Sequence, residues 1–145
     1  MIKEFSFKPI GYVRTDADED QIRKDRKSVI SEELTEALDG IEDFSHLFII
    51  FYMHKAFTEQ LSLKVHPRGR LDLPLLGVFA TRSPYRPNPI GLTLVELIKR
   101  NGNKIKVRGL DAINGTPVID IKPYDPLDLV LEAHVPEWWI KLHQD

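Results

Sequence analysis

Hydrophobic and polar positions alternate over short stretches along most of this 145-residue chain, which is typical of β-strands. Such runs cover 5–13, 61–65, 92–99, 104–110 and 118–121, and 75–81 is a further apolar run. From His46 to His54 the chain is almost uninterrupted Leu, Phe, Ile and Tyr, which predicts a central strand that is buried on both faces or lies in a closed barrel. Asn101-Gly102-Asn103 separates two of the runs and predicts a tight hairpin.

Helical patterns are few and short. Apolar residues recur at helical spacing over 34–41, where Ser31 can cap the first turn and Gly40 suits the end. Pro136 can open a terminal helix that carries Trp138 and Trp139. Short strands without long helices between them argue against a doubly wound sheet. They predict a mainly antiparallel barrel or curled sheet in one domain over 1–145.

Composition narrows the possible chemistry. The net charge is -2, from 20 basic and 22 acidic residues, so any contact with nucleic acid must use a local patch. The absence of cysteine excludes disulfides, thiolate zinc sites and cysteine nucleophiles. The first ten residues lack the pattern of a signal peptide, and the apolar run 47–53 is too short to span a bilayer, so we expect a cytoplasmic protein.

The most unusual segment runs from Gly77 to Gly91, where three prolines fall within six residues. Each proline fixes its own backbone angle and pushes the preceding residue toward an extended conformation, which predicts a rigid, non-repetitive loop over 83–90. Such a loop would hold Arg82 and Arg86 for contacts with a carboxylate or phosphate, and would offer Tyr85 as a stacking surface. Surface salt bridges explain the two arginines equally well on composition alone.

This segment, followed by Leu92-Thr-Leu-Val-Glu-Leu97, resembles the signature of the tRNA-methyltransferase O (TsaA-like) family. Further segments agree in order and spacing: Phe44 to Leu47, Phe51 to Lys55, and Val107 to Asp111 leading to Gly115 to Tyr124. The resemblance implies a small single-sheet antiparallel β-barrel with a few short helices, which forms a homodimer. It also implies that S-adenosylmethionine binds near the subunit interface and that its methyl group is transferred to N6 of threonylcarbamoyladenosine at position 37 of tRNA, next to the anticodon.

The resemblance also implies particular site residues. Those matching the family's donor-binding positions are Arg23, Lys24, His54, Lys55, Arg82, Leu92, Asp111, Asn114, Gly115, Thr116 and Pro117. Independently of the resemblance, charge and stacking lead us to expect tRNA contacts from Tyr85, Arg86 and the basic cluster 23–27, which includes Arg26. An arginine suits the methionine carboxylate of the donor, and a carboxylate suits its ammonium group or ribose hydroxyls. The residues themselves also allow structural roles: a strand-end hydrogen bond for His54, and turn formation for Asp111 and Asn114.

The chain departs from the family pattern in two places. Asn114 stands where the family usually has Asp, and Ile22-Arg-Lys-Asp25 stands where it commonly has a Pro-Arg-Gln-like motif. This second segment lies beside an acidic stretch, 16–20, and inside a basic cluster, 23–27, which both read as loop or solvated surface. No catalytic residue is assigned, because Asp111, Asp120 and Tyr85 are all candidate bases and a structural role explains each of them as well.

Two other functions stay open. The chain can be a module that binds S-adenosylmethionine without transferring its methyl group. It can also be a small-molecule hydrolase that uses His46, His54 or His66 as general base or metal ligand. The second alternative is disfavoured, because His46 and His54 are too far apart along one extended strand to chelate a single ion.

Overall fold

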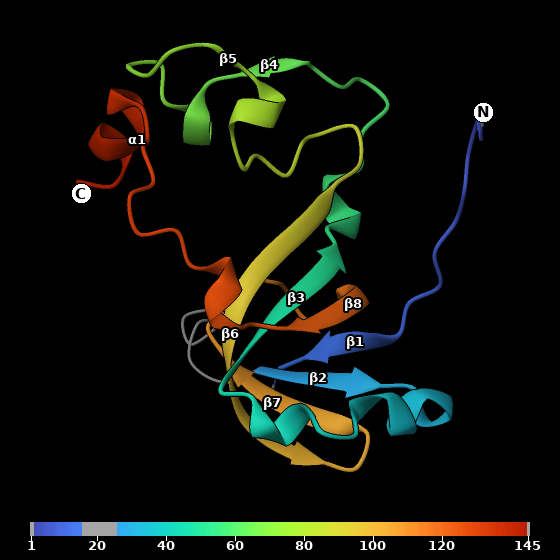
Figure 1. Ribbon diagram of the computed structural model, residues 1–145. Coiled ribbons are helices and arrows are strands. Elements are labelled where there is room, and N and C mark those ends of the chain that lie inside the picture. Colours follow the sequence, from blue (N-terminus) through green and yellow to red (C-terminus); the bar gives the residue numbers. More distant parts are fainter. Residues whose placement is uncertain (1, 16–25, 145) are drawn as a thin grey trace.

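Figure 1 shows the computed structural model, which describes residues 2–15 and 26–144, with the backbone alone for 26–29. Six strands form a closed antiparallel barrel in the order β1-β2-β7-β6-β3-β8, and β1 pairs with β8 to complete the ring. The strands are β1 (Gly11–Arg14), β2 (Arg26–Ile30), β3 (His46–Tyr52), β6 (Ile90–Asn101), β7 (Lys104–Arg108) and β8 (Pro117–Pro123). The prediction of a mainly β fold with an antiparallel barrel is therefore confirmed.

Strand β3 is the central strand that the apolar run predicts. It pairs with β6 along its whole length and with β8 on its other side. Leu47, Ile49 and Phe51 are buried in the barrel, while the residues between them are half-buried on the outer surface. The strand ends at Tyr52, because the Met53 amide donates to the Pro89 carbonyl at 2.7 Å and a 3-10 turn, η4 (His54–Ala56), follows.

The hairpin predicted at Asn101-Gly102-Asn103 is also confirmed. Strands β6 and β7 pair up to Asn101 and Lys104, and Gly102 has a φ of +58°. A left-handed backbone of this kind costs glycine little, because it has no Cβ. The register of the pair shifts between Leu97 and Lys99.

The helix expected over 34–41 is replaced by two 3-10 segments, η2 (Glu32–Leu38) and η3 (Ile41–Asp43). Gly40, with a φ of +91°, separates them, and Ser31 makes no side-chain cap, so the single-helix interpretation was wrong. The apolar spacing still identified a buried residue, since Leu38 packs in the barrel core.

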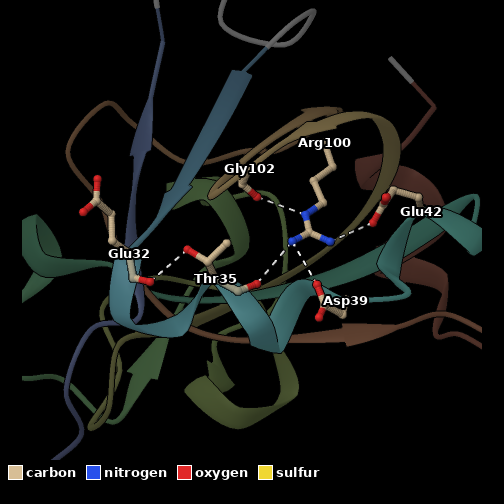
Figure 2. A network of polar contacts seen from close by, with 6 residues as sticks. All are labelled: Glu32, Thr35, Asp39, Glu42, Arg100 and Gly102. Atoms are coloured by element: carbon tan, nitrogen blue, oxygen red, sulfur yellow. Dashed lines mark hydrogen bonds and ion pairs between the residues drawn. The ribbon is translucent and has the colours of Figure 1, made fainter.

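Arg100 of β6 holds these two segments in place, as Figure 2 shows. Its guanidinium group donates to the Thr35 carbonyl at 3.2 Å and forms ion pairs with Asp39 at 3.2 Å and Glu42 at 3.0 Å. The hydrogen bond to Glu42 is the main cause that raises the pKa of Arg100 above its ordinary value. One side chain thus connects the barrel wall to both 3-10 segments.

A smaller layer lies beyond the ends of β3 and β6 (Figure 1). It contains β4 (Lys64–Val65), η5 (Pro67–Gly69), β5 (Leu76–Gly77), η6 (Val78–Ala80) and the terminal helix α1 (Glu137–Leu142); η7 (Pro126–Asp128) precedes that helix in the chain. The terminal helix is as predicted after Pro136, but the strand runs 61–65 and 75–81 shorten to two residues each.

An ion pair between Lys141 of α1 and Asp72, at 3.2 Å, attaches the helix to this layer. The pKa of Asp72 lies well below its ordinary value, mainly because the Arg70 side chain hydrogen-bonds to the carboxylate and also because Lys141 does so. Leu73, Val78 and Leu142 are buried outside the barrel's own cluster of buried residues. The layer therefore buries apolar side chains that do not belong to the barrel core.

At the other end of the chain the strand is shorter than predicted. Strand β1 begins at Gly11, whereas Phe5 and Phe7 are 72% and 64% exposed and their rings contact each other. No helix among residues 2–15 and 26–144 is long and apolar enough to cross a membrane.

We predict that Gly91→Ala destabilises the protein. Gly91 lies opposite Phe51 in the β3–β6 pair, and a Cβ at Gly91 would overlap the Phe51 ring. Overpacking a core in this way typically costs about 1–3 kcal/mol of unfolding free energy. Urea denaturation followed by circular dichroism measures this cost.

Gly77→Ala is the matched control, because a Cβ at Gly77 meets no atom within 4 Å and the backbone φ is -57°. Its midpoint should equal or slightly exceed that of the wild type. Equal midpoints for the two variants would contradict the role given to Gly91.

Candidate functional site

Three segments that are distant in the sequence meet at one end of the barrel and form an open pocket of about 260 Å³. They are the turn after β3, the proline loop between β5 and β6, and the connection from β7 to β8. The pocket is lined by Phe51, Met53, His54, Lys55, Ala56, Pro84, Tyr85, Asp111, Ala112, Ile113 and Thr116. Its walls combine apolar side chains with a few polar groups, which is the usual composition of a small-molecule site.

His54 has an unsatisfied polar atom at this pocket. Its Nδ1 is buried and has no hydrogen-bond partner among the described residues. A buried polar atom without a partner is costly, and native structures rarely keep one without a reason. The structural alternative for His54, a bond to a neighbouring carbonyl through this atom, is absent from the described part of the chain. The atom is therefore available to a ligand.

The connection from residue 111 to 117 is fixed to the end of β1. The Gly115 amide donates to the Val13 carbonyl, and the Thr15 amide donates to Oδ1 of Asn114 at 3.2 Å. Gly115 needs its glycine, because its φ is +87°. Thr116 is 2% exposed, and its hydroxyl donates to the Ile113 carbonyl at 2.7 Å. Asn114 thus has the turn-forming role that its sequence also allows, while Asp111 stays exposed at the pocket.

The loop predicted over 83–90 has no regular secondary structure up to residue 89, whereas Ile90 already begins β6. Hydrogen bonds to its own backbone hold the loop. Nη1 of Arg86 donates to the carbonyls of Thr81 and Ser83 at 3.0 and 3.2 Å. Arg82 is exposed, and among the described residues it forms neither a hydrogen bond nor an ion pair. The two arginines therefore differ: Arg86 stiffens the loop, whereas Arg82 is available to bind an anion.

The structure brings only part of the expected residues together. His54, Lys55, Tyr85, Asp111 and Thr116 line the pocket. Arg82, Asn114, Gly115, Pro117 and Arg86 belong to the segments that form it but do not line it, and Leu92 lies half-exposed on the outer face of β6. Arg23 and Lys24 fall outside the described residues, and only the backbone of Arg26 is described.

Sequence reasoning missed the apolar wall of the pocket. Phe51 and Ala112 belong to the barrel core, and Met53 packs against it. Their signal in the sequence is that of core residues, so only the fold shows that they also face the pocket. Among the candidate bases, Asp111 and Tyr85 line the pocket, whereas Asp120 forms an ion pair with Lys122 at 3.0 Å and does not.

The other histidines are used elsewhere. Nδ1 of His46 lies 2.8 Å from the Ser45 hydroxyl, and Nδ1 of His66 lies 2.8 Å from the Leu73 carbonyl. In the described part of the chain, no three His, Cys, Asp or Glu side chains gather as a metal site would require. The histidine hydrolase alternative thus has no support in the described residues.

Comparison with known protein families shows to which family the chain belongs. Residues 19–128 match the model of the tRNA-methyltransferase O N-terminal domain. The chain belongs to this family. The matched range includes all three segments of the pocket and five of the six barrel strands.

Individual members of the family support the assignment. A probable S-adenosyl-L-methionine-binding protein of Methanocaldococcus jannaschii is 43% identical over 81% of this chain and 90% of its own length. The human tRNA (adenine(37)-N6)-methyltransferase is 52% identical over 61% of this chain, but that match covers 20% of the human protein. A probable S-adenosyl-L-methionine-binding protein of Methanothermobacter thermautotrophicus is 53% identical over 63% of this chain and 64% of its own length. The chain therefore spans less than two thirds of several relatives.

Solved structures of the family share the fold. A crystal structure of TrmO superposes with a TM-score of 0.72 at 35% identity and covers 91% of this chain and 63% of that one. The TrmO of Pseudomonas aeruginosa gives a TM-score of 0.71 at 31% identity over 92% of this chain and 61% of that one.

We predict that Arg86→Met loosens the proline loop. Loss of the hydrogen bonds to Thr81 and Ser83 removes about 1.5–3 kcal/mol of local stability, because charged donors make the stronger bonds. Hydrogen exchange of the Ser83 and Tyr85 amides should then accelerate roughly ten- to hundredfold. Arg82→Met is the matched control and should leave these rates unchanged. Equal rates for Arg86→Met and wild type would show that the loop does not depend on Arg86.

Proposed function

We propose that this protein is an S-adenosylmethionine-dependent tRNA methyltransferase that acts on N6 of threonylcarbamoyladenosine at position 37. The observation that carries the proposal is the pocket, where residues from three family motifs, His54 and Lys55, Tyr85, and Asp111 and Thr116, converge from separate parts of the chain. The names of the family relatives point to the same donor and the same base. We expect the enzyme to be cytoplasmic, because tRNA is present in the cytoplasm.

The pocket suits the donor chemically. Phe51, Met53 and Ile113 offer an apolar wall for the adenine. Asp111 is an exposed carboxylate that suits the ammonium group or the ribose hydroxyls, and Nδ1 of His54 can bond to a polar atom of the ligand. The proposed donor-binding set is completed by four residues of the segments that form the pocket, Arg82, Asn114, Gly115 and Pro117. It also includes Leu92, Arg23 and Lys24.

Cations near the pocket suit the acidic groups of the two substrates. Lys55 is exposed at the pocket, and Arg82 lies two residues before Pro84 of its wall. One of them can bind the methionine carboxylate of the donor. The threonyl carboxylate of the modified base requires a second cation, for which Arg26 and Arg86 stay candidates beside the stacking surface of Tyr85.

The donor supplies a sulfonium methyl group, which leaves its sulfur readily. The protein's task is then to align the N6 nitrogen with that methyl group, and such positioning alone lowers a barrier substantially. Because N6 is conjugated with a carbonyl, removal of its proton also helps the reaction. Asp111 and Tyr85 are the two candidate bases that line the pocket, and we assign the step to neither.

A module that binds the donor without transferring methyl is the second candidate. It is favoured by the names of several relatives, which mention binding alone. The divergent segment 22–25, which lies outside the described residues, is the other reason to keep this candidate.

We further propose that the protein is a homodimer that uses the outer face of β3 and β6. Ile50 lies opposite Leu92 and Phe48 opposite Leu94 on this face, where Leu92 and Leu94 are 50% and 45% exposed. A continuous apolar surface on a barrel wall is typical of an interface. A second subunit would also enclose the pocket, whose volume of about 260 Å³ lies below the roughly 300–1,000 Å³ of most ligand sites.

The proposed activity is tested by transfer of labelled methyl from S-adenosylmethionine to tRNA purified from cells with and without the threonylcarbamoyl modification. We predict label on the modified tRNA only. Donor binding without label on either tRNA would contradict the enzyme and favour the donor-binding module. Label on both tRNAs would show that the enzyme does not require threonylcarbamoyladenosine as its substrate.

We predict that His54→Ala raises the dissociation constant of the donor about tenfold, as expected for the loss of one hydrogen bond of about 1.4 kcal/mol in a buried site. Isothermal titration calorimetry measures this change. His134→Ala is the control, since His134 is exposed and far from the pocket in the chain. Unchanged affinity in His54→Ala would remove His54 from the donor site.

The dimer is tested by sedimentation velocity. We predict that the wild type sediments as a dimer and that Leu94→Glu sediments as a monomer, because a carboxylate would be buried in the apolar face. Leu63→Glu is the matched control, since Leu63 is 67% exposed and lies near β4, away from the barrel wall. A monomeric wild type would contradict the proposal.

A further inference from the structure

Phe79 is an aromatic side chain on the surface of the small layer, in η6 directly before the proline loop. It is 77% exposed, although the backbone around it is fixed. Val78 beside it is buried, and the Val78 carbonyl accepts two hydrogen bonds from Thr81, from the amide at 3.1 Å and from the hydroxyl at 2.8 Å. The ring therefore projects into solvent from a rigid support.

Arg86 holds the Phe79 ring from one side. Its guanidinium carbon lies 5.8 Å from the centre of the ring, which is within the range of a cation–π contact. The same guanidinium group donates to the carbonyls of Thr81 and Ser83, so the loop fixes its position. Because the residue is largely exposed, the face of the ring away from Arg86 is open to solvent.

This arrangement distinguishes Phe79 from the other exposed apolar residues of the layer. Single apolar side chains on a surface are common and need no function, and Leu71, which is 84% exposed, is such a residue. Among the cation–π contacts in the described part of the chain, that of Phe79 is the one in this layer. An exposed ring that is already held in place loses little conformational entropy when a partner stacks on it.

The ring lies beside the pocket without forming part of it. The Arg86 group that covers one face of the ring also bonds to Ser83, and the next two residues in the chain, Pro84 and Tyr85, line the pocket. Phe79 itself is not a lining residue. One side chain thus connects the ring to the pocket wall, and the ring stays free when a ligand occupies the pocket.

A base that enters such a pocket leaves the stack of its own RNA. A neighbouring base then exposes one of its faces to water, and proteins that bind single-stranded RNA cover such faces with aromatic side chains. Each stack contributes about 1–3 kcal/mol and tolerates any base, because every base has a π face. Phenylalanine has no polar group that could read a base edge, so its side chain suits stacking.

We propose that Phe79 is the stacking platform for a nucleotide adjacent to position 37 of the tRNA while the adenosine at that position lies in the pocket. This inference rests on the proposed function and names a residue that positions the RNA. Phe79 acts on the nucleotide beside the reacting one and contacts neither the donor nor N6. Its loss should therefore raise the KM for tRNA more than it lowers kcat.

The test measures binding of an unmodified tRNA anticodon stem-loop, with S-adenosylhomocysteine present, by fluorescence anisotropy over a series of salt concentrations. Phe79→Ala should bind roughly 5- to 150-fold more weakly, as expected for the loss of one stack of about 1–3 kcal/mol. The slope of log K against log salt should stay the same, because no charge is removed. Phe79→Tyr keeps an aromatic face and should bind like the wild type, and so should the matched control Leu71→Ala.

Three results would overturn the inference. The first is unchanged affinity in Phe79→Ala, and the second is an equal loss of affinity in Phe79→Ala and Phe79→Tyr. The third comes from sedimentation velocity: a Phe79→Ala variant with a different oligomeric state from the wild type would show that the ring contacts a second subunit instead of RNA.

Further measurements separate this inference from the proposed activity. The dissociation constant of S-adenosylmethionine should be the same in Phe79→Ala and the wild type, which also shows that the variant is folded. If the wild type binds the stem-loop through Phe79 yet transfers no methyl, the stacking role is correct and the proposed activity is wrong. If the wild type transfers methyl and Phe79→Ala does so with an unchanged KM for tRNA, the activity is correct and the stacking role is wrong.

Discussion

The contact between Phe51 and Gly91 is the constraint on which the rest of the structure depends. The Phe51 ring occupies the space in which any other residue at position 91 would place its Cβ, so the β3–β6 pair closes tightly at the pocket end. Phe51 also lines the pocket. Immediately beyond it, the Met53 amide bonds to Pro89 and turns the chain into the segment that carries His54. One packing contact thus fixes both the barrel wall and the distance between the turn after β3 and the proline loop.

The residues of the family motifs near this contact divide into two groups. Arg86, Asn114 and Thr116 use their polar atoms on neighbouring backbone groups and hold the loops in shape. His54, Asp111 and Arg82 make no such contacts among the described residues and so keep their polar atoms for a ligand. Preorganised binding requires both groups: residues that keep the loops rigid and residues whose polar atoms are available to the ligand. The loops then need not be ordered when the ligand binds.

The strands of the barrel could be predicted from the sequence because their alternation reports burial directly, as in β3 and the β6–β7 hairpin. In the segments where the prediction was wrong, the apolar pattern does not report burial in this way. Gly40 interrupts a helical pattern with a left-handed turn, and Phe5 and Phe7 have strand-like spacing but no partner strand. For the site, the motifs indicated which segments meet but not which atoms are engaged. Arg82 and Arg86 are equivalent in the sequence, and only the loop geometry separates them.

The central claim is that the donor binds at the barrel end, between the turn after β3, the proline loop and the 111–117 connection. Titration of isotope-labelled protein with S-adenosylhomocysteine, followed by amide chemical shifts, tests it most directly. The account predicts that the largest shifts occur at residues 53–56, 81–86 and 111–117. Shifts concentrated instead at the second depression, lined by Pro9, Tyr12, Ser31 and Asn103 among others, would contradict it.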